Sequence, residues 1–310
     1  MSEAGLVVNG GSPRAGVEPD SVGAVLDALS VQLGGAFAPP ERQEACDLMA
    51  AVLDVPRFWP AAHAPRQLTR EERVAIEEAA ARLQRGMPFA YAVRRAAFRT
   101  LSLYVDERVL IPRPETELLV DIVLEVTGGG GGTAVDVGTG SGCIALSLAT
   151  EGKFECVIGT DVSAAAIEVA RRNYELRIAN RKCEGETGPI VEFRLGSFLA
   201  PCRGDLVDVV VSNPPYISWN EAADLPALVR DWEPAVALFA DDDGMACIRE
   251  IALQAASVLR VEGLLALEVD SRRAGRALDS VAAIAAYRDV VVRPDLTGRA
   301  RFLLARRAEE

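Results

Sequence analysis

The chain has 310 residues, half of them hydrophobic and a quarter charged, which is typical of globular proteins with one large core or two smaller ones. Its 45 acidic and 33 basic residues give a formal net charge of −12, so the overall field repels a phosphate backbone and disfavours nucleic acid as a direct partner. The six cysteines form no C-x-x-C pair and the single histidine, His63, stands alone, which argues against a metal site, a redox motif or a histidine-dependent triad.

The N-terminal residues 1–19 lack the basic start and apolar run of a secretory or transit peptide, and we expect a disordered lead here. No apolar stretch approaches the eighteen or so residues that a membrane helix needs. The sequence therefore predicts a cytoplasmic protein with no membrane partner, and we expect a monomer.

Residues 20–95 are predicted to form a small helical domain. Apolar residues recur at three- and four-residue spacing in VGAVLDALSVQL and ACDLMAAVL, and proline-rich breaks such as APPE and VPRFWP separate such segments. The third helix has the clearest start, because Thr69 can cap the free backbone N–H groups while Glu72 reaches back to it. Gly86 and Pro88 end this helix.

Residues 96–112 are predicted to form a β-hairpin that links two domains. In AFRTLSLYVD apolar residues alternate with polar ones, as in a half-buried strand. After a break at Asp106 and Glu107, the segment RVLIP is interpreted as the second strand.

From residue 113 to residue 310 predicted strands alternate with helices. The strands are TAVDV, CVIGT, IVEFRL, LVDVVVS, GLLALEV and a last pair around VVVRP and RFLLAR, and helices are predicted from Cys143, from Ser163 and from Met245 to Leu259. Because parallel strands need crossover connections, this alternation predicts an α/β domain with a doubly wound sheet and helices on both of its faces.

The segment AVDVGTGSGCIALSLA combines a buried strand, a glycine-rich loop and an apolar helix. Glycines suit a backbone that turns sharply at the end of a strand and approaches a ligand, which then faces the helix N-terminus. We expect this loop to bind a nucleotide-type cofactor, whose identity the loop alone leaves open. Its residues are Gly138, Thr139, Gly140, Ser141 and Gly142.

Asp161 closes the next predicted strand, about 20 residues after the first glycine of the loop. A carboxylate in this place can accept hydrogen bonds from both ribose hydroxyls of a cofactor. Asp161 or Ser163 could also cap the following helix, and the two roles are compatible. NAD-dependent enzymes share this geometry, so the loop and the carboxylate leave an oxidoreductase open.

The motif Asn213-Pro214-Pro215-Tyr216, which follows the strand LVDVVVS, separates these classes. An amide or aromatic amine nitrogen is a poor nucleophile, because its lone pair is delocalised into the adjoining π-system. The Asn213 side-chain oxygen and the Pro214 carbonyl can accept the two N–H bonds of a planar NH₂ group, and the proline rings keep these acceptors rigid. Tyr216 can stack on that group and aim its nitrogen at a methyl carbon. The motif predicts methyl transfer to nitrogen, and a plain turn after a strand is the alternative.

Taken together, these motifs resemble the HemK/PrmC family, the N(5)-glutamine methyltransferases that act on class I peptide chain release factors. The resemblance runs from about residue 20 to the end, through RGMPFAYAVRRAAF, VLIPRPETELLV, DVGTGSG, DVSAAAIEVARRN, VSNPPYI, VRDWEPAVALFADDDG and RPDLTGRARFLLAR. The pairing of IPRPETE with NPPY is specific, because DNA and RNA amino-methyltransferases with N-P-P-Y loops generally lack the former.

The resemblance implies a class I, Rossmann-like methyltransferase domain over residues 113–310 that uses S-adenosyl-L-methionine. It implies that the helical residues 20–95 help to grip the release factor, whose GGQ glutamine is the substrate. The implied cofactor-binding residues are Gly138, Thr139, Gly140, Ser141, Gly142, Asp161, Phe198 and Asn213. The implied substrate-binding residues are Asn213, Pro214, Pro215 and Tyr216, with Asn213, Pro214 and Tyr216 as the catalytic group.

Two segments depart from the family's pattern. The family commonly has Gly-Asp and a large apolar or aromatic residue beside the adenine, where this chain has Gly196-Ser197-Phe198. Phe198 can still stack on adenine, whereas Ser197 cannot supply a carboxylate. The family's E-x-G-x-x-Q is Glu268 to Arg273 here, without the glycine and the glutamine.

Other functions remain open at this point. Within the same class they are a glutamine methyltransferase of a ribosomal protein and an amino-methyltransferase acting on adenine in nucleic acid, and the acidity of the chain and PRPETE weigh against the latter. From another class, an NAD-binding oxidoreductase explains the glycine loop and Asp161 but leaves NPPY and the helical domain without a role.

Overall fold

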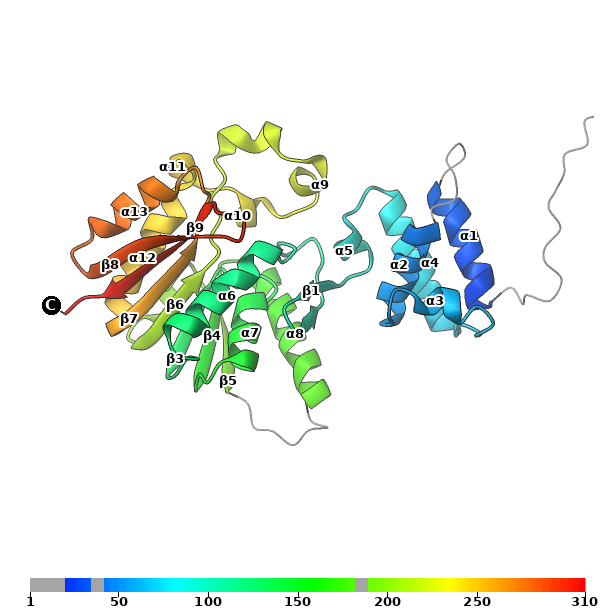
Figure 1. Ribbon diagram of the computed structural model, residues 1–310, viewed down its shortest axis with the longest axis horizontal. Coiled ribbons are helices and arrows are strands. Elements are labelled where there is room, and N and C mark those ends of the chain that lie inside the picture. The colour runs from blue at the N-terminus through cyan, green and yellow to red at the C-terminus, as the bar shows by residue number, and fades with distance from the viewer. Residues whose placement is uncertain (1–19, 35–41, 182–188, 310) are drawn as a thin grey trace, which may run out of the picture. The chain divides into compact units, whose positions relative to one another are not determined.

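The computed structural model describes residues 20–34, 42–181 and 189–309 of the chain, shown in Figure 1. The chain divides into two compact units, with the boundary between Val93 and Arg94. The lead expected at residues 1–19 lies outside the described residues.

The first unit is built from helices. They are α1 (Val22–Gly34), α2 (Arg42–Leu53), α3 (Trp59–Ala62), α4 (Arg70–Gln84) and α5 (Phe89–Ala92). Buried side chains of the three longer helices, among them Leu26, Met49 and Ile76, form one apolar cluster. The capping box predicted for α4 is confirmed, because Thr69 Oγ1 accepts from the Glu72 backbone N–H at 3.2 Å and Glu72 Oε2 accepts from the Thr69 backbone N–H at 2.9 Å.

The second unit begins with a hairpin of β1 (Ala96–Phe98) and β2 (Leu101–Leu103). The prediction of a second strand at RVLIP is wrong: both strands come from AFRTLSL, and a two-residue turn at Arg99, whose φ is +52°, joins them. The chain does not extend again after Leu103, because the Asp106 carboxylate accepts from the backbone N–H of Arg108 at 3.1 Å and closes a local turn.

A seven-stranded sheet forms the centre of the second unit, in the order β5-β4-β3-β6-β7-β9-β8. The strands are β3 (Thr133–Val137), β4 (Cys156–Asp161), β5 (Ile190–Leu195), β6 (Val207–Ser212), β7 (Leu259–Glu268), β8 (Tyr287–Pro294) and β9 (Ala300–Arg307). The five strands from β5 to β7 are parallel, while β9 runs antiparallel to both β7 and β8. The predicted doubly wound sheet is therefore confirmed, with an antiparallel pair at one edge.

Helices cover both faces of this sheet, as Figure 1 shows. The longer ones are α6 (Pro114–Val126), α7 (Cys143–Glu151), α8 (Ala164–Arg181), α12 (Ala246–Val258) and α13 (Ala274–Ala282). The helices α6, α7 and α8 share one apolar cluster with strand residues such as Ala134 and Phe302, and α12 and α13 share another with Val135 and Leu303. Neighbouring strand residues thus enter opposite cores, as the two-residue period of a strand requires.

The strand order reverses between β3 and β6, which are neighbours although β4 and β5 lie between them in sequence. In parallel sheets such a switch point opens a crevice at the carboxyl ends of the strands. Short segments follow β5 and β6 at this edge: η1 (Ala200–Cys202), η2 (Trp219–Asp224), α9 (Ala227–Arg230), α10 (Ala235–Leu238) and α11 (Asp241–Gly244). Among the described residues, no helix combines the length and apolar character needed to span a membrane.

Candidate active site

A cavity of about 330 Å³ opens at the switch point of the sheet. Its volume lies within the range of small-molecule sites, and like them it is lined mainly by apolar groups. The lining comes from the segments after β3, β4, β5 and β6, from residues 108–110, and from α10 and α12. It includes Gly138, Gly140, Asp161, Ser197, Phe198, Asn213, Pro214 and Pro215 from the predicted site and its neighbourhood.

The glycine loop turns sharply at the carboxyl end of β3. Gly138, Gly140 and Gly142 have φ of +73°, +54° and +83°, conformations that favour glycine. The backbone N–H groups of Gly138 and Thr139 donate to the Thr160 carbonyl at 2.8 and 2.9 Å, which ties the loop to β4. Gly138 and Gly140 line the cavity, so bare backbone forms this part of its wall.

Thr139 and Ser141 are buried and are not part of the cavity lining. The Thr139 hydroxyl donates to Asp136 Oδ2 at 2.7 Å, and the backbone N–H of Ala145 donates to the same oxygen at 3.1 Å. The Ser141 carbonyl accepts from Asn173 Nδ2 at 2.8 Å. Burial raises the pKa of Asp136 to about 7. These contacts hold the loop in place on the side that does not line the cavity. Direct cofactor binding by Thr139, Ser141 or Gly142 stays a prediction.

Asp161 lies at the carboxyl end of β4 and faces the cavity. Its Oδ2 accepts from the backbone N–H of Gly140 at 3.0 Å, and its Oδ1 accepts from that of Ser163 at 2.9 Å. The helix cap falls to Ser163, whose hydroxyl oxygen accepts from the Ala166 backbone N–H at 3.2 Å. Burial raises the pKa of Asp161, and the backbone hydrogen bonds lower it. A carboxylate has about four lone-pair sites, so this one can still accept ribose hydroxyls.

The segment after β5 supplies an aromatic ring to the same cavity. Ser197 and Phe198 both line it, and the Thr160 hydroxyl donates to the Phe198 carbonyl at 2.8 Å. Phe198 has a φ of +49°, a strained conformation for a residue with a side chain, and the hydrogen bond from β4 helps to hold it. A planar base can stack on this ring, while the Ser197 hydroxyl offers no charge beside it.

A second, smaller cavity of about 110 Å³ adjoins the larger one at the NPPY segment. Asn213, Pro214 and Pro215 line both cavities, whereas Tyr216 and Arg113 line the smaller one alone. The predicted substrate residues are therefore brought together, and the segment from Asn213 to Pro215 is a wall that the two spaces share.

Hydrogen bonds orient the Asn213 side chain in this wall. Its Nδ2 donates to Thr116 Oγ1 at 3.0 Å, and the Thr116 hydroxyl donates to Glu268 Oε2 at 2.7 Å. Among the described residues, none donates to Asn213 Oδ1. The sequence analysis did not identify Thr116 and Glu268 as members of the site. Thr116 lies in PRPETE, which carries the family resemblance, and Glu268 begins the segment that departs from the family's pattern.

A buried acid joins two further motifs beside the smaller cavity. Glu233 accepts from Arg113 Nη2 at 2.6 Å and from the backbone N–H of Ile111 at 3.4 Å. The Glu233 side chain is only 1% exposed, and burial raises its pKa while Arg113 lowers it. The pair holds IPRP of residues 111–114 against the WEP of residues 232–234.

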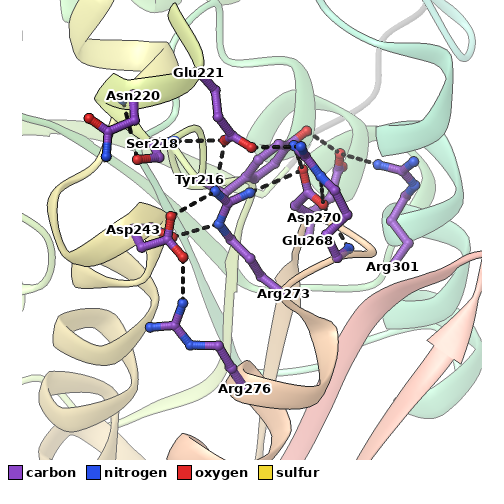
Figure 2. Close-up of polar contacts among 11 residues, drawn as sticks. Tyr216, Ser218, Asn220, Glu221, Asp243, Glu268, Asp270, Arg273, Arg276 and Arg301 are labelled. Carbon is purple, nitrogen blue, oxygen red and sulfur yellow. Dashed lines mark hydrogen bonds and ion pairs between the residues drawn. The ribbon is translucent and has the colours of Figure 1, made fainter.

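The segment Glu268 to Arg273, which departs from the family's pattern, forms a compact ion-pair cluster (Figure 2). Arg273 is 5% exposed; its Nε donates to the Asp243 carbonyl at 2.6 Å and its Nη2 to Glu221 Oε2 at 2.7 Å. Asp270 Oδ2 lies 3.5 Å from Arg273 Nη1. Asp270 and Arg273, which stand where the family has glycine and glutamine, thus lie close together, and their opposite charges attract each other.

The same ion-pair cluster also contacts the backbone just after Tyr216. Glu221 also accepts from the backbone N–H of Ser218 at 3.1 Å, within the cap of η2. Gly244 has a φ of +81°, and a Cβ there would lie 2.2 Å from the Tyr216 carbonyl oxygen. The ion pairs and this close approach fix the backbone that leaves the NPPY segment.

Comparisons with known proteins agree on both units. Residues 24–93 match the family model of the PrmC N-terminal domain, and residues 114–229 match that of the methyltransferase small domain. The chain is 41% identical to the release factor glutamine methyltransferase of Moorella thermoacetica over 255 residues, which cover 79% of this chain and 87% of that protein. The enzyme of the same name from Cereibacter sphaeroides is 35% identical over 91% of this chain and 96% of its own length.

Among solved structures, the hMettl16 catalytic domain in complex with MAT2A 3'UTR hairpin 1 aligns with a TM-score of 0.53. The alignment covers 78% of this chain and 82% of that one at 17% identity, and it shows a shared methyltransferase fold. The close relatives are matched over most of their length, from the helical unit through the α/β unit. The chain therefore belongs to the family of release factor glutamine methyltransferases.

Proposed function

We propose that this chain transfers a methyl group from S-adenosyl-L-methionine to the side-chain amide nitrogen of the GGQ glutamine in a class I peptide chain release factor. The observation that carries the proposal is the segment from Asn213 to Pro215, which lines both a larger and a smaller cavity. The relatives named release factor glutamine methyltransferase support the choice of substrate.

The larger cavity suits the methyl donor, which supplies an electrophilic methyl group on a sulfonium. Asp161 would accept the ribose hydroxyls, and Phe198 would stack on the adenine. At Gly138 and Gly140 the backbone itself lines the cavity, so a ligand can approach the loop closely. The place of Gly138, Gly140, Asp161 and Phe198 in the lining supports this assignment of the larger cavity.

The smaller cavity suits the carboxamide of a glutamine. The Oδ1 of Asn213 and the carbonyl of Pro214 would accept the two N–H bonds of the substrate amide. Both acceptors increase the electron density on the nitrogen and leave its lone pair free to attack the methyl carbon, whose bond to sulfur breaks as the new C–N bond forms. Tyr216 would pack on the planar amide.

Substrate selection would extend beyond this cavity. The chain carries a formal net charge of −12, which favours a protein partner with basic surface over a nucleic acid. The helical unit is the part that matches the PrmC N-terminal domain, and we assign to it the recognition of the release factor.

The test is methylation of a purified class I release factor, with the added methyl located by peptide mass spectrometry. We expect the methyl on the GGQ glutamine and on no other residue. In parallel, Asn213→Ala should lower the turnover about a hundred- to a thousandfold, by analogy with a lost oxyanion-hole donor, and change donor affinity much less. Asn213→Asp keeps an acceptor oxygen and should retain more activity than alanine. A methyl on another residue, or wild-type turnover by Asn213→Ala, would contradict the proposal.

A further inference from the structure

We infer that Thr116 and Glu268 are positioning residues for this reaction. Glu268 orients the Thr116 hydroxyl, which in turn holds the Asn213 carboxamide with its oxygen toward the substrate. The inference rests on the proposed function, because it assigns a cause to the orientation that the substrate amide requires.

Three elements distant in sequence supply this chain of hydrogen bonds. Thr116 lies in the first turn of α6, Glu268 ends β7, and Asn213 follows β6. The distances are 3.0 Å from Asn213 Nδ2 to Thr116 Oγ1 and 2.7 Å from Thr116 Oγ1 to Glu268 Oε2. Thr116 is 2% and Glu268 1% exposed, so water competes little for these bonds.

The donor and acceptor groups of the three side chains fix the direction of these hydrogen bonds. A carboxylate can only accept hydrogen bonds, so the single hydroxyl hydrogen of Thr116 is donated to Glu268. The Thr116 oxygen is then left as an acceptor, and its other partner must be a donor. Asn213 meets this demand only with its NH₂ group toward Thr116. A flipped carboxamide would set its oxygen against the Thr116 oxygen and would lose the hydrogen bond between the two side chains.

Glu268 has further contacts, which Figure 2 shows. The Tyr216 hydroxyl lies 3.5 Å from Glu268 Oε1, and Arg301 Nη1 lies 3.9 Å from the same oxygen. Burial raises the pKa of Glu268 above its usual range, and the Thr116 hydroxyl, the Arg301 guanidinium and the Tyr216 hydroxyl offset part of that rise by stabilising the carboxylate. One carboxylate thus lies behind two members of the NPPY segment, Asn213 and Tyr216.

The role can be separated from mere packing by a double-mutant cycle. Thr116→Val keeps the shape and removes the hydroxyl, and we expect kcat to fall about tenfold, the value of one lost hydrogen bond, while KM for the donor changes little. Thr116→Ser should restore kcat to within about threefold. In an Asn213→Ala background, Thr116→Val should change kcat less than about twofold, because the group that it orients is absent.

Thr127→Val is the matched control, since Thr127 ends the same helix and its hydroxyl donates to the Val123 carbonyl at 2.6 Å. An equal loss of kcat from Thr116→Val in both backgrounds, or no loss at all, would overturn the inference. If Thr116→Val does not fold, Glu268→Gln is the alternative variant. Its side-chain amide can donate to the Thr116 oxygen, so the direction of the hydrogen bonds to Asn213 is no longer fixed. Its loss of kcat should also disappear in the Asn213→Ala background, and an undiminished loss would overturn the inference.

The proposed site and the positioning role can be refuted separately. Wild-type turnover by Asn213→Ala contradicts the proposed site itself. A loss of turnover in Asn213→Ala together with full activity in Thr116→Val and Glu268→Gln contradicts only the positioning role.

Discussion

Replacement of Asp161 by asparagine tests the donor site with the smallest change of shape. The two carboxylate oxygens accept from the backbone N–H groups of Gly140 at 3.0 Å and Ser163 at 2.9 Å. Asparagine has one acceptor oxygen, so its NH₂ group must face one of these donors. A buried donor left without a partner costs about 1–3 kcal/mol, and we expect the free energy of unfolding of Asp161→Asn to fall by about this amount.

The same substitution should weaken donor binding. A hydrogen bond to a charged group contributes about 1.5–3 kcal/mol, which corresponds to a roughly 10- to 100-fold loss of affinity. The ionised carboxylate is the better acceptor, and burial raises the pKa of Asp161. Donor affinity of the wild-type protein should therefore fall as the pH is lowered through this raised pKa, while the affinity of Asp161→Asn should not show that step.

Calorimetric titration with S-adenosylmethionine across pH, and urea unfolding without the donor, measure the two effects separately. Asp279→Asn is the control, since it removes the same charge from an exposed position on α13. An affinity of Asp161→Asn within twofold of wild type would remove Asp161 from the donor site. Tight binding of NAD with none of the methyl donor would refute the cofactor itself.

Three further predictions concern the cluster beside NPPY, the base of the glycine loop and the helical unit. Arg273→Gln removes the buried cation that pairs with Glu221 and Asp243. Because both acids are partly exposed, we expect the free energy of unfolding to fall by no more than about 3 kcal/mol. A decrease below about 1 kcal/mol in urea unfolding would contradict a stabilising role for this ion-pair cluster. Burial raises the pKa of Asp136 to about 7, from an ordinary value of about 4. Between about pH 4 and pH 7 the folded state therefore holds one proton more than the unfolded state. The free energy of unfolding of the wild-type protein should decrease as the pH rises through this range. Asp136→Asn should lack this decrease, and parallel stability curves for the two proteins would argue against it. A truncated chain that starts at Arg94 should keep donor binding, since its apolar clusters are its own, and lose release-factor methylation; full methylation by the folded truncation would exclude the helical unit from recognition.

Local patterns predicted much of this fold. The α4 cap depends on residues three positions apart, and the strands around the glycine loop are short, mainly apolar segments typical of buried parallel strands. The hairpin at Ala96 was harder, because alternation continues through its turn and Arg99 carries no glycine or asparagine signal for a positive φ. The short helix α13 was not anticipated, since it follows Ser271-Arg272-Arg273 without a clear start signal.

Most of the predicted site residues line the two cavities, with Thr139, Ser141 and Gly142 as the exceptions, but the contacts that orient them could not be read from the sequence. Asn213 and Thr116 are 97 positions apart, and Thr116 and Glu268 are 152 apart. Asp270 and Arg273 look like losses when compared with the family's motif, yet their opposite charges lie within one cluster. Only the three-dimensional arrangement shows that Glu221 and Asp243 complete it.

The wall from Asn213 to Pro215 bears on the order of kinetic events. If the donor occupies the larger cavity and the glutamine the smaller one, as proposed, neither needs to leave before the other binds. The methyl group would then pass directly between two ligands that are bound at the same time, through a ternary complex and without a methylated enzyme intermediate. Initial-rate plots for donor and release factor should therefore intersect, as sequential mechanisms require, and demethylated donor should compete with the methyl donor and not with the protein substrate.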